Sequence, residues 1–486
     1  MTFLEVIIYI MKDKLKEIYS SENFKETGHE LVELLAKYIS DSEKQDIPVN
    51  NYMEPNEQLE YWRNYKLDDK NPITLFQDII EKSIHIHNPK YIGHQVSAPA
   101  PLAALSNLFT ALMNNSMAIY EMGPASTAIE KAVVEEISNK IGYGEKGDGY
   151  ITSGGTLANL TALLAARAVI VKSDIWETGY NEKLAVMVSE EAHYCVDRAC
   201  RIMGFGTDGI IKIPVGDKFT MKTELLGEYF AKAEKEEIRV IAVVGSAPST
   251  STGMHDDLEA IAEFCSEKKL WFHIDGAHGG GAIYSKKYKH LLKGIEKADS
   301  VVIDAHKMLM MPSLMTFLMF KNKMDSYATF SQKAQYLWES SDEEEWYNMA
   351  KRTFECTKQM MGVKFYTLLK VYGEEVFNQF VTNQYDLGQE LARLAKMRNN
   401  IQLATEPESN IVCFRYFEPK FSNQELNQRN SYIRSKILRK GDFYIVQTLL
   451  NDLVYMRATI MNPLTTSLIF EELLDEVEKL GCEKTS

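Results

Sequence analysis

Short apolar runs alternate with helix-length segments from Gly149 to about residue 320, and this pattern restricts the possible folds more than any other feature of the sequence. The runs are rich in Val and Ile and include residues 183–190, 238–247, 270–275 and 300–305. Strands that are buried on both faces of a parallel sheet form such continuous runs, because helices connect them and cover both faces. The sequence therefore predicts an α/β domain with a mostly parallel sheet.

The pattern of apolar and charged residues changes on either side of this region. Charged helical patterns come first, and beyond about residue 365 helices alternate with a few strands, at 410–417 and 453–462. We predict an N-terminal helical segment that takes part in dimer formation, a large α/β domain and a smaller α+β domain, at residues 1–86, 87–364 and 365–486. The acidic run at 340–345 is expected to be a solvated loop.

Charge and cysteine content exclude several classes of protein. A formal net charge of -14 and a pI near 5.4 disfavour nucleic acid and anionic lipid as partners. The six cysteines show neither CxxC nor metal-ligand spacing, which indicates reduced thiols, a cytoplasmic enzyme and no metal site.

The apolar run within residues 1–19 is too short for a signal peptide or a membrane span. We interpret it as an amphipathic helix that packs on a partner subunit or on the body; translation from Met11 is the alternative.

Two apolar runs each end in one charged residue, Asp275 in WFHID and Lys307 in SVVIDAHK. Ligands of open α/β sheets bind beyond the carboxyl ends of the strands, so both side chains are expected to meet in one crevice. A third run ends in the Gly-rich turn 152–156 before a long helix, whose free N–H groups suit a phosphate. Taken singly, each feature is more often structural: a turn, a cap or a surface lysine.

Together these features meet the needs of pyridoxal phosphate (PLP). This cofactor requires an amine for covalent attachment, a carboxylate beside its ring nitrogen and a cradle for its phosphate. Lys307, Asp275 and the turn 153–156 supply them in that order. His193, after another predicted strand, is placed to stack on the ring; a core histidine at a helix start is the alternative.

The motifs SGGTLAN, SEEAHYCVDRA, HIDGAHGGG and DAHKM resemble the group II PLP-dependent amino-acid decarboxylases. The resemblance extends from residue 87 to near the C-terminus. It implies the aspartate-aminotransferase fold (fold type I), with PLP bound in the large domain and a smaller C-terminal domain. It also implies a homodimer that acts on a small L-amino acid.

By this resemblance, Lys307 holds the cofactor covalently, Asp275 pairs with the ring nitrogen and His193 stacks on the ring. The resemblance also implies cofactor contacts near the phosphate, from Gly154, Gly155, Thr156 and His306, and under the ring, from Ala277. Ser249 and Thr250 are implied as further contacts, although their segment GSAPSTSTG departs from the family pattern. Asp304 replaces an asparagine that is common in the family. A carboxylate beside a phosphate is unfavourable, so we expect Asp304 to point away or to bind a cation.

The residues leave the branch of the family open. NNSMAIYEMGP, RTFECTK, Gln95 and Arg457 resemble glutamate and cysteine-sulfinate decarboxylases, whereas HQVSAPAP and MNPLTT also resemble bacterial enzymes acting on diaminobutyrate and lysine. Tyr91, His94, Gln95 and Arg457 are the predicted substrate residues. We expect a polar or acidic substrate, namely glutamate, aspartate, cysteine sulfinate or diaminobutyrate, and the choice among them stays open.

The segment 329–347 has a polar, acid-rich tail and is predicted to be a loop that closes over substrate. In the family, a tyrosine on such a loop protonates the product carbon, which points to Tyr336 as the general acid; packing on Trp338 is the alternative. Other functions remain open: an aromatic-amino-acid decarboxylase, an aldehyde-forming relative, an aminotransferase or cysteine desulfurase of the same fold, or an inactive protein on this scaffold.

Overall fold

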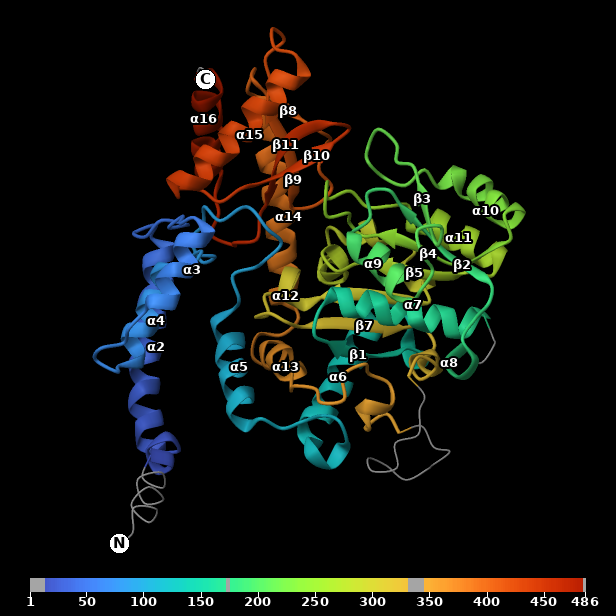
Figure 1. Ribbon diagram of the computed structural model, residues 1–486, viewed down its shortest axis with the longest axis horizontal. Helices are drawn as coiled ribbons and strands as arrows, with labels where there is room; N and C mark the ends of the chain where they lie inside the picture. Colours follow the sequence, from blue (N-terminus) through green and yellow to red (C-terminus); the bar gives the residue numbers. More distant parts are fainter. Residues whose placement is uncertain (1–13, 172–174, 331–344, 484–486) are drawn as a thin grey trace.

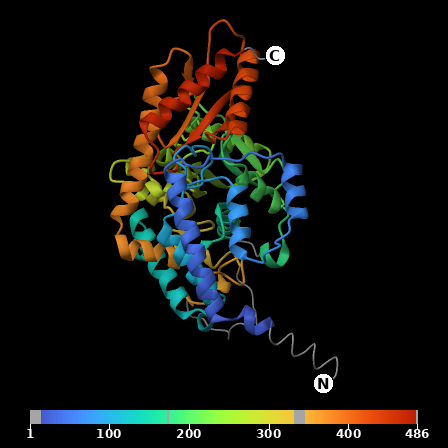
Figure 2. The ribbon, with the colours of Figure 1, turned by 90° about the vertical axis from the view of Figure 1, so that its left-hand side faces the viewer.

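The computed structural model describes residues 14–171, 175–330 and 345–483 (Figure 1). Three helices, α2 (Ser21–Glu43), α3 (Pro55–Asn64) and α4 (Pro72–Glu81), lie along one side of the molecule. They face the viewer in Figure 2. The hydroxyl of Ser20 accepts a hydrogen bond from the Asn23 N–H and caps α2, so the cap fixes where this helix begins. The predicted amphipathic helix at 1–19 lies mostly outside the described residues.

The centre of the molecule is a seven-stranded sheet with the order β1-β7-β6-β5-β4-β2-β3. Strands β2 to β6 run parallel to one another, whereas β7 is antiparallel to both of its neighbours, β6 and β1. The predicted mostly parallel α/β sheet is therefore confirmed. The strands are β1 (Asp148–Thr152), β2 (Lys183–Ser189), β3 (Ile210–Ile213), β4 (Ile238–Ser246), β5 (Trp271–Asp275), β6 (Ser300–Asp304) and β7 (Thr316–Phe320).

Helices cover both faces of this sheet, which explains the continuous apolar runs. Ala185 and Met187 of β2 belong to one buried cluster, whereas Val186 and Val188 belong to the cluster on the opposite face. Successive side chains of a strand point to opposite faces, so apolar residues are favoured at most positions of a strand that is covered on both faces. The covering helices are α6 (Pro124–Ile141), α10 (Leu226–Lys235) and α11 (Leu258–Lys268) on one side, and α7 (Gly155–Val171) and α9 (Tyr194–Ile202) on the other.

The C-terminal part forms a second, four-stranded antiparallel sheet with the order β10-β11-β9-β8. Its strands are β8 (Ile401–Leu403), β9 (Ile411–Tyr416), β10 (Val446–Leu450) and β11 (Leu453–Thr459). The two edge strands, β8 and β10, were not predicted, because one is very short and the other exposes Gln447 and Leu449. The remaining helices are α5 (Pro101–Met113), α8 (Ile175–Thr178), α12 (Ala305–Met308), α13 (Gly362–Tyr372), α14 (Glu375–Lys396), α15 (Asn423–Lys440) and α16 (Ser467–Cys482).

The acidic run 340–345 was expected to form a solvated loop. Most of the acidic run 340–345 lies outside the described residues, but Glu345 is buried and pairs with Lys351 at 2.8 Å. For Glu345 the expectation of a solvated side chain is wrong, because an ion pair compensates its burial. Within the described ranges, no helix is long and apolar enough to span a lipid bilayer.

Candidate active site

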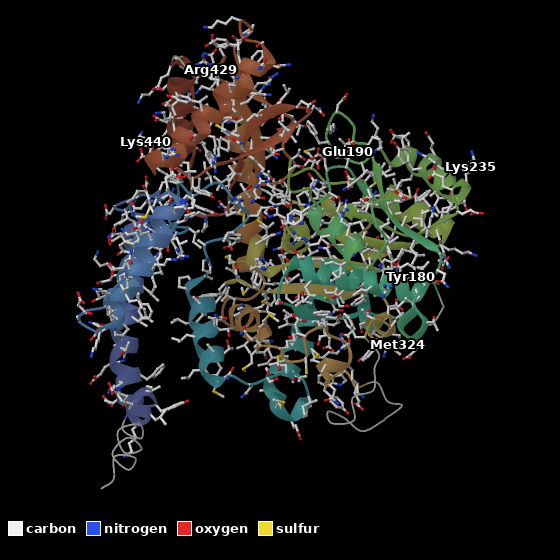
Figure 3. All side chains as sticks on the ribbon, viewed as in Figure 1. Tyr180, Glu190, Lys235, Met324, Arg429 and Lys440 are labelled. Carbon is white, nitrogen blue, oxygen red and sulfur yellow. The ribbon has the colours of Figure 1, made fainter. Side chains whose placement is uncertain are left out.

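A cavity of about 470 Å³ lies at the carboxyl ends of the parallel strands. The residues that follow β1, β2 and β4 form its wall together with the ends of β5 and β6, because parallel strands deliver their carboxyl ends to one edge of a sheet. Glu190, labelled in Figure 3, directly follows β2 on this side of the sheet. Every predicted cofactor residue lines the cavity: Gly154, Gly155, Thr156, His193, Ser249, Thr250, Asp275, Ala277, His306 and Lys307.

Asp275 presents its carboxylate from the last position of β5. One oxygen accepts a hydrogen bond from the Ala277 N–H at 3.1 Å, and the other lies 3.8 Å from Sγ of Cys195. Burial, and then the charge of Asp275, raise the pKa of the Cys195 thiol, so the thiol keeps its proton and donates to the carboxylate. Asp275 is therefore oriented from two sides.

Lys307 and Asp304 form an ion pair within the cavity. Nζ of Lys307 lies 2.9 Å from Oδ2 of Asp304. Burial favours the neutral amine, but the charges of Asp304 and Asp275 outweigh it, so the pKa of Lys307 is raised above its usual value. Asp304 thus does not point away from the site; it takes the cation that the alternative expectation required, and that cation is Lys307.

His193 forms the N-cap of α9. Its Nδ1 accepts a hydrogen bond from the Cys195 N–H at 3.3 Å, which leaves the ring proton on Nε2. Burial lowers the pKa of His193. The side chain is therefore a neutral imidazole at neutral pH, with its N–H on Nε2.

The Gly-rich turn after β1 leads directly into α7. Gly154 has a φ of 137°, in the region that favours glycine, and Gly155 is the first residue of the helix. Nδ2 of Asn159 donates to the Gly155 carbonyl at 2.8 Å, and its Oδ1 lies 2.8 Å from Nε2 of the buried His273 on β5. The first N–H groups of α7 thus face the cavity from a fixed turn and suit a phosphate.

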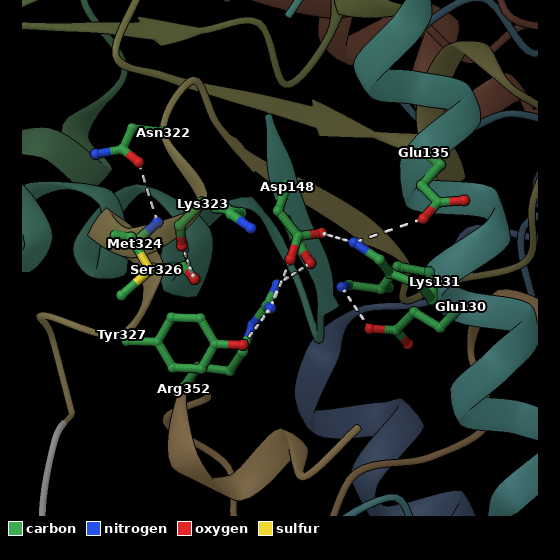
Figure 4. Close-up of polar contacts among 12 residues, drawn as sticks. Glu130, Lys131, Glu135, Asp148, Asn322, Lys323, Met324, Ser326, Tyr327 and Arg352 are labelled. Carbon is green, nitrogen blue, oxygen red and sulfur yellow. Dashed lines mark hydrogen bonds and ion pairs between the residues drawn. The ribbon is translucent and has the colours of Figure 1, made fainter. Parts of the chain in front are cut away.

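The segment 352–358, which covers the open edge of β1, holds this turn in place. Glu355 accepts hydrogen bonds from the N–H and the hydroxyl of Ser153 at 3.4 and 2.8 Å. Close by, Arg352 is buried and donates to the carboxylate of Asp148 at 2.7 Å (Figure 4). Glu355 was not predicted to act at the site; its signal in the sequence was a carboxylate within the RTFECTK motif.

The same segment reaches the open edge of β1. Glu130 of α6 accepts a hydrogen bond from the Ile151 N–H at 2.9 Å and pairs with Lys358. Both charged side chains are buried. Because β1 is an edge strand, Glu130 supplies an acceptor that a neighbouring strand would otherwise provide, and Lys358 neutralises its charge.

The predicted substrate residues do not line the cavity. Tyr91 is buried and stacks on Tyr444, with ring centroids 5.2 Å apart. His94 is exposed beside the same tyrosine. Arg457 comes closest to the cavity, because its Nη1 donates to the carbonyl of Thr250 at 2.8 Å.

Among the predicted substrate residues, two side-chain nitrogens have no hydrogen-bond partner within the described part of the chain. They are Nε2 of Gln95 and Nε of Arg457, and both are buried. An unpaired buried donor is costly, so these atoms are candidates for contacts with a ligand. Tyr336, the predicted general acid, lies outside the described residues.

Comparison with known proteins decides the family. The model of the pyridoxal-dependent decarboxylase conserved domain matches residues 71–417. The chain belongs to the pyridoxal-dependent decarboxylase family. It is 26% identical to the acidic amino acid decarboxylase GADL1 of Xenopus tropicalis, over 99% of this chain and 92% of that protein. It is 28% identical to an aspartate 1-decarboxylase of Aliivibrio fischeri, over 84% and 82% of the two chains.

The fold agrees with this assignment. The crystal structure of mouse CSAD matches with a TM-score of 0.89 at 23% identity and covers 96% of this chain and 100% of that one. This pyridoxal-dependent decarboxylase is thus a carboxy-lyase of fold type I that uses PLP. The site fits the cofactor, because one cavity of suitable volume contains an amine, a carboxylate and a helix N-terminus.

Proposed function

We propose that this enzyme removes carbon dioxide from an L-amino acid with an acidic side chain and releases the amine. The observation that carries the proposal is the meeting of Lys307, Asp275 and the N-terminus of α7 in one cavity. Within it, Lys307 attaches the cofactor, Asp275 holds a proton on the ring nitrogen, and the turn 153–156 binds the phosphate.

Bound PLP supplies an electron sink for the pair of electrons that carbon dioxide leaves behind. Asp275 strengthens this effect, since a buried carboxylate stabilises positive charge on the ring nitrogen. His193, neutral and with its proton on Nε2, would stack on the ring of the bound cofactor. The product carbon then needs a proton, for which Tyr336 remains our first candidate and His193 the second.

Arg457 supports an acidic substrate. The guanidinium group is buried, and one of its donors, Nε, has no partner among the described residues. Although part of His94 is exposed to solvent, the protein around its ring partly desolvates it and lowers its pKa, and the charges of Arg457 and Arg434 lower the pKa further. Positive charge beside Thr250, which lines the cavity, favours a carboxylate or sulfinate side chain, because such a group can accept two hydrogen bonds from an arginine.

Glu191 favours a second candidate, diaminobutyrate. Its carboxylate accepts a hydrogen bond from Ser251, the residue after Thr250. A carboxylate this close to Thr250 suits an ammonium side chain. The preference between the two substrates depends on whether the charge of Arg457 or that of Glu191 dominates the electrostatic potential beside Thr250.

We also propose a homodimer. Helix α5 exposes Leu105, Leu108, Phe109 and Leu112, which recur at the spacing of one helix face. An exposed apolar stripe of this kind usually marks an interface, and a second copy of the chain is the proposed partner. Sedimentation velocity gives the test.

The free cysteines support the predicted cytoplasmic location.

Carbon dioxide release from a panel of L-amino acids tests the proposed reaction. The panel contains aspartate, glutamate, cysteine sulfinate, diaminobutyrate, tyrosine and tryptophan, and the amine is quantified with the gas. We expect the highest kcat/KM for an acidic member and equal amounts of amine and gas. Keto acid without carbon dioxide would indicate an aminotransferase, and aldehyde in place of amine would indicate an aldehyde-forming enzyme.

A further inference from the structure

Asp304 lies between the reactive amine and the predicted phosphate turn. Its carboxylate is 2% exposed. Oδ1 accepts a hydrogen bond from the Thr316 hydroxyl at 2.5 Å, and Oδ2 lies 2.9 Å from Nζ of Lys307. Both oxygens are also 3.1 Å from the point that a Cβ on Gly155 would occupy. The carboxylate therefore contacts the first residue of α7 and Lys307 at once.

The surroundings of this ion pair contain little other positive charge. Among the described residues that line the cavity, Lys307 is the only lysine or arginine, whereas Asp275 and Asp304 are both carboxylates. Nε2 of His306 lies 3.7 Å from Oδ2 of Asp304. His193 and Cys195, at the start of α9, also lie within the field of Asp304, and Thr316 contacts it from β7.

This arrangement affects how Lys307 can react. An ammonium group has no lone pair, so Lys307 must first release a proton to solvent. Its nitrogen can then bond to the aldehyde carbon of the cofactor, and the aldehyde oxygen leaves as water with the two hydrogens of the amine. A buried carboxylate at 2.9 Å stabilises the ammonium and opposes the first of these steps.

We propose that Asp304 is a positioning residue that holds Lys307 as an ammonium beside the phosphate turn until the cofactor arrives. This inference rests on the proposed role of Lys307. It predicts that loss of the Asp304 charge makes the amine more reactive, which is the opposite of the effect expected from a residue that only supports the fold.

The test measures the reactivity of Lys307 in the cofactor-free enzyme. The protein is treated with trace acetic anhydride from about pH 6 to about pH 10, and acetylation of the Lys307 peptide is quantified by mass spectrometry. Lys235, which is exposed on α10 (Figure 3), serves as the internal reference. In the wild type, we expect acetylation of Lys307 to rise at higher pH than that of Lys235. A rise at lower pH, as burial without the ion pair would cause, overturns the proposal.

Variants separate charge from packing. In Asp304→Asn the amide oxygen can still accept a hydrogen bond from Thr316, and we expect Lys307 to react at least about tenfold faster near neutral pH. Thr316→Val retains the charge and should stay within about twofold of the wild type. Equal rates in Asp304→Asn and the wild type at every pH would overturn the proposal.

Pyridoxal, which lacks the phosphate, gives a second readout. If Asp304 acts through Lys307, Asp304→Asn captures pyridoxal and PLP faster by similar factors. Acceleration with PLP alone would show that Asp304 acts by repelling phosphate, and would overturn the proposed role. If the acetylation results hold but the cofactor is attached to another lysine, the ion pair stands and the proposed function of Lys307 fails.

Discussion

Ser153 donates both its backbone N–H and its hydroxyl to a single oxygen of Glu355, at 3.4 and 2.8 Å. Ser153 directly precedes the glycines that lead into α7, and Glu355 belongs to the segment that covers the edge of β1. A residue far away in the sequence therefore fixes the position of the turn that we propose as the phosphate site.

We predict that Glu355→Ala weakens PLP binding by about tenfold or more, since a hydrogen bond to a charged group contributes about 1.5–3 kcal/mol. Pyridoxal, which has no phosphate, should bind equally well to the variant and the wild type. Equilibrium binding to the cofactor-free protein measures both affinities, and Glu263→Ala, at an exposed position on α11, is the matched control. Equal loss of affinity for pyridoxal and PLP would argue for a general disturbance of the cavity.

Asp275→Asn should retain the cofactor but lose at least about a hundredfold in kcat, because an amide stabilises a protonated ring nitrogen far less than a carboxylate does. The bound cofactor is quantified by absorbance and the rate by carbon dioxide release. Activity within about tenfold of the wild type would refute the role of Asp275.

Arg457→Gln should raise KM for the preferred acidic amino acid by about ten- to a hundredfold, with a smaller effect on kcat, because it removes the charged donor that we propose for the substrate side chain in both the ground state and the transition state. Steady-state kinetics give both constants. Arg398→Gln, which disrupts a surface pair with Asp475, is the control. An unchanged KM for every acidic substrate would remove Arg457 from the site.

Asp148 predicts a pH dependence of stability. Burial raises its pKa, but Arg352 and Lys131 outweigh this effect, so the pKa in the folded protein is lowered. The stabilisation is present above the unfolded-state pKa of about 3.9 and is lost as the pH falls through the folded-state value.

Asp148→Asn should therefore flatten the acid side of the stability curve. It should also cost about 3–5 kcal/mol at neutral pH, because Arg352 remains buried without its counter-ion. Urea unfolding over a pH series measures the free energy of unfolding. Parallel curves for variant and wild type would show that Asp148 contributes nothing to the pH dependence.

The sequence predicted the strands of the large domain because strands that are covered on both faces consist mostly of apolar residues. It also predicted that Asp275 and Lys307 share a crevice, since both follow parallel strands. The ion pair of Lys307 with Asp304 was only one of two expectations, because a pattern of residues does not show the direction in which a side chain points.

Other features depend on contacts between distant segments, which no local pattern encodes. The bond between Glu355 and Ser153 joins residues 202 positions apart. Tyr91 was expected to face the substrate, whereas the structure packs it on Tyr444, and that partner lies in the C-terminal part of the chain. β10 was missed because an edge strand with exposed Gln447 and Leu449 lacks the continuous apolar run of the central strands.

The most direct test of the site is the identity of the lysine that carries the cofactor. The enzyme is loaded with PLP, reduced with borohydride and digested, and the modified peptide is sequenced by mass spectrometry. The structure predicts the cofactor on Lys307, with no modified peptide from Lys307→Ala. Attachment to any other lysine, or the same modified peptide pattern in Lys307→Ala, would contradict the assignment of this cavity as the active site.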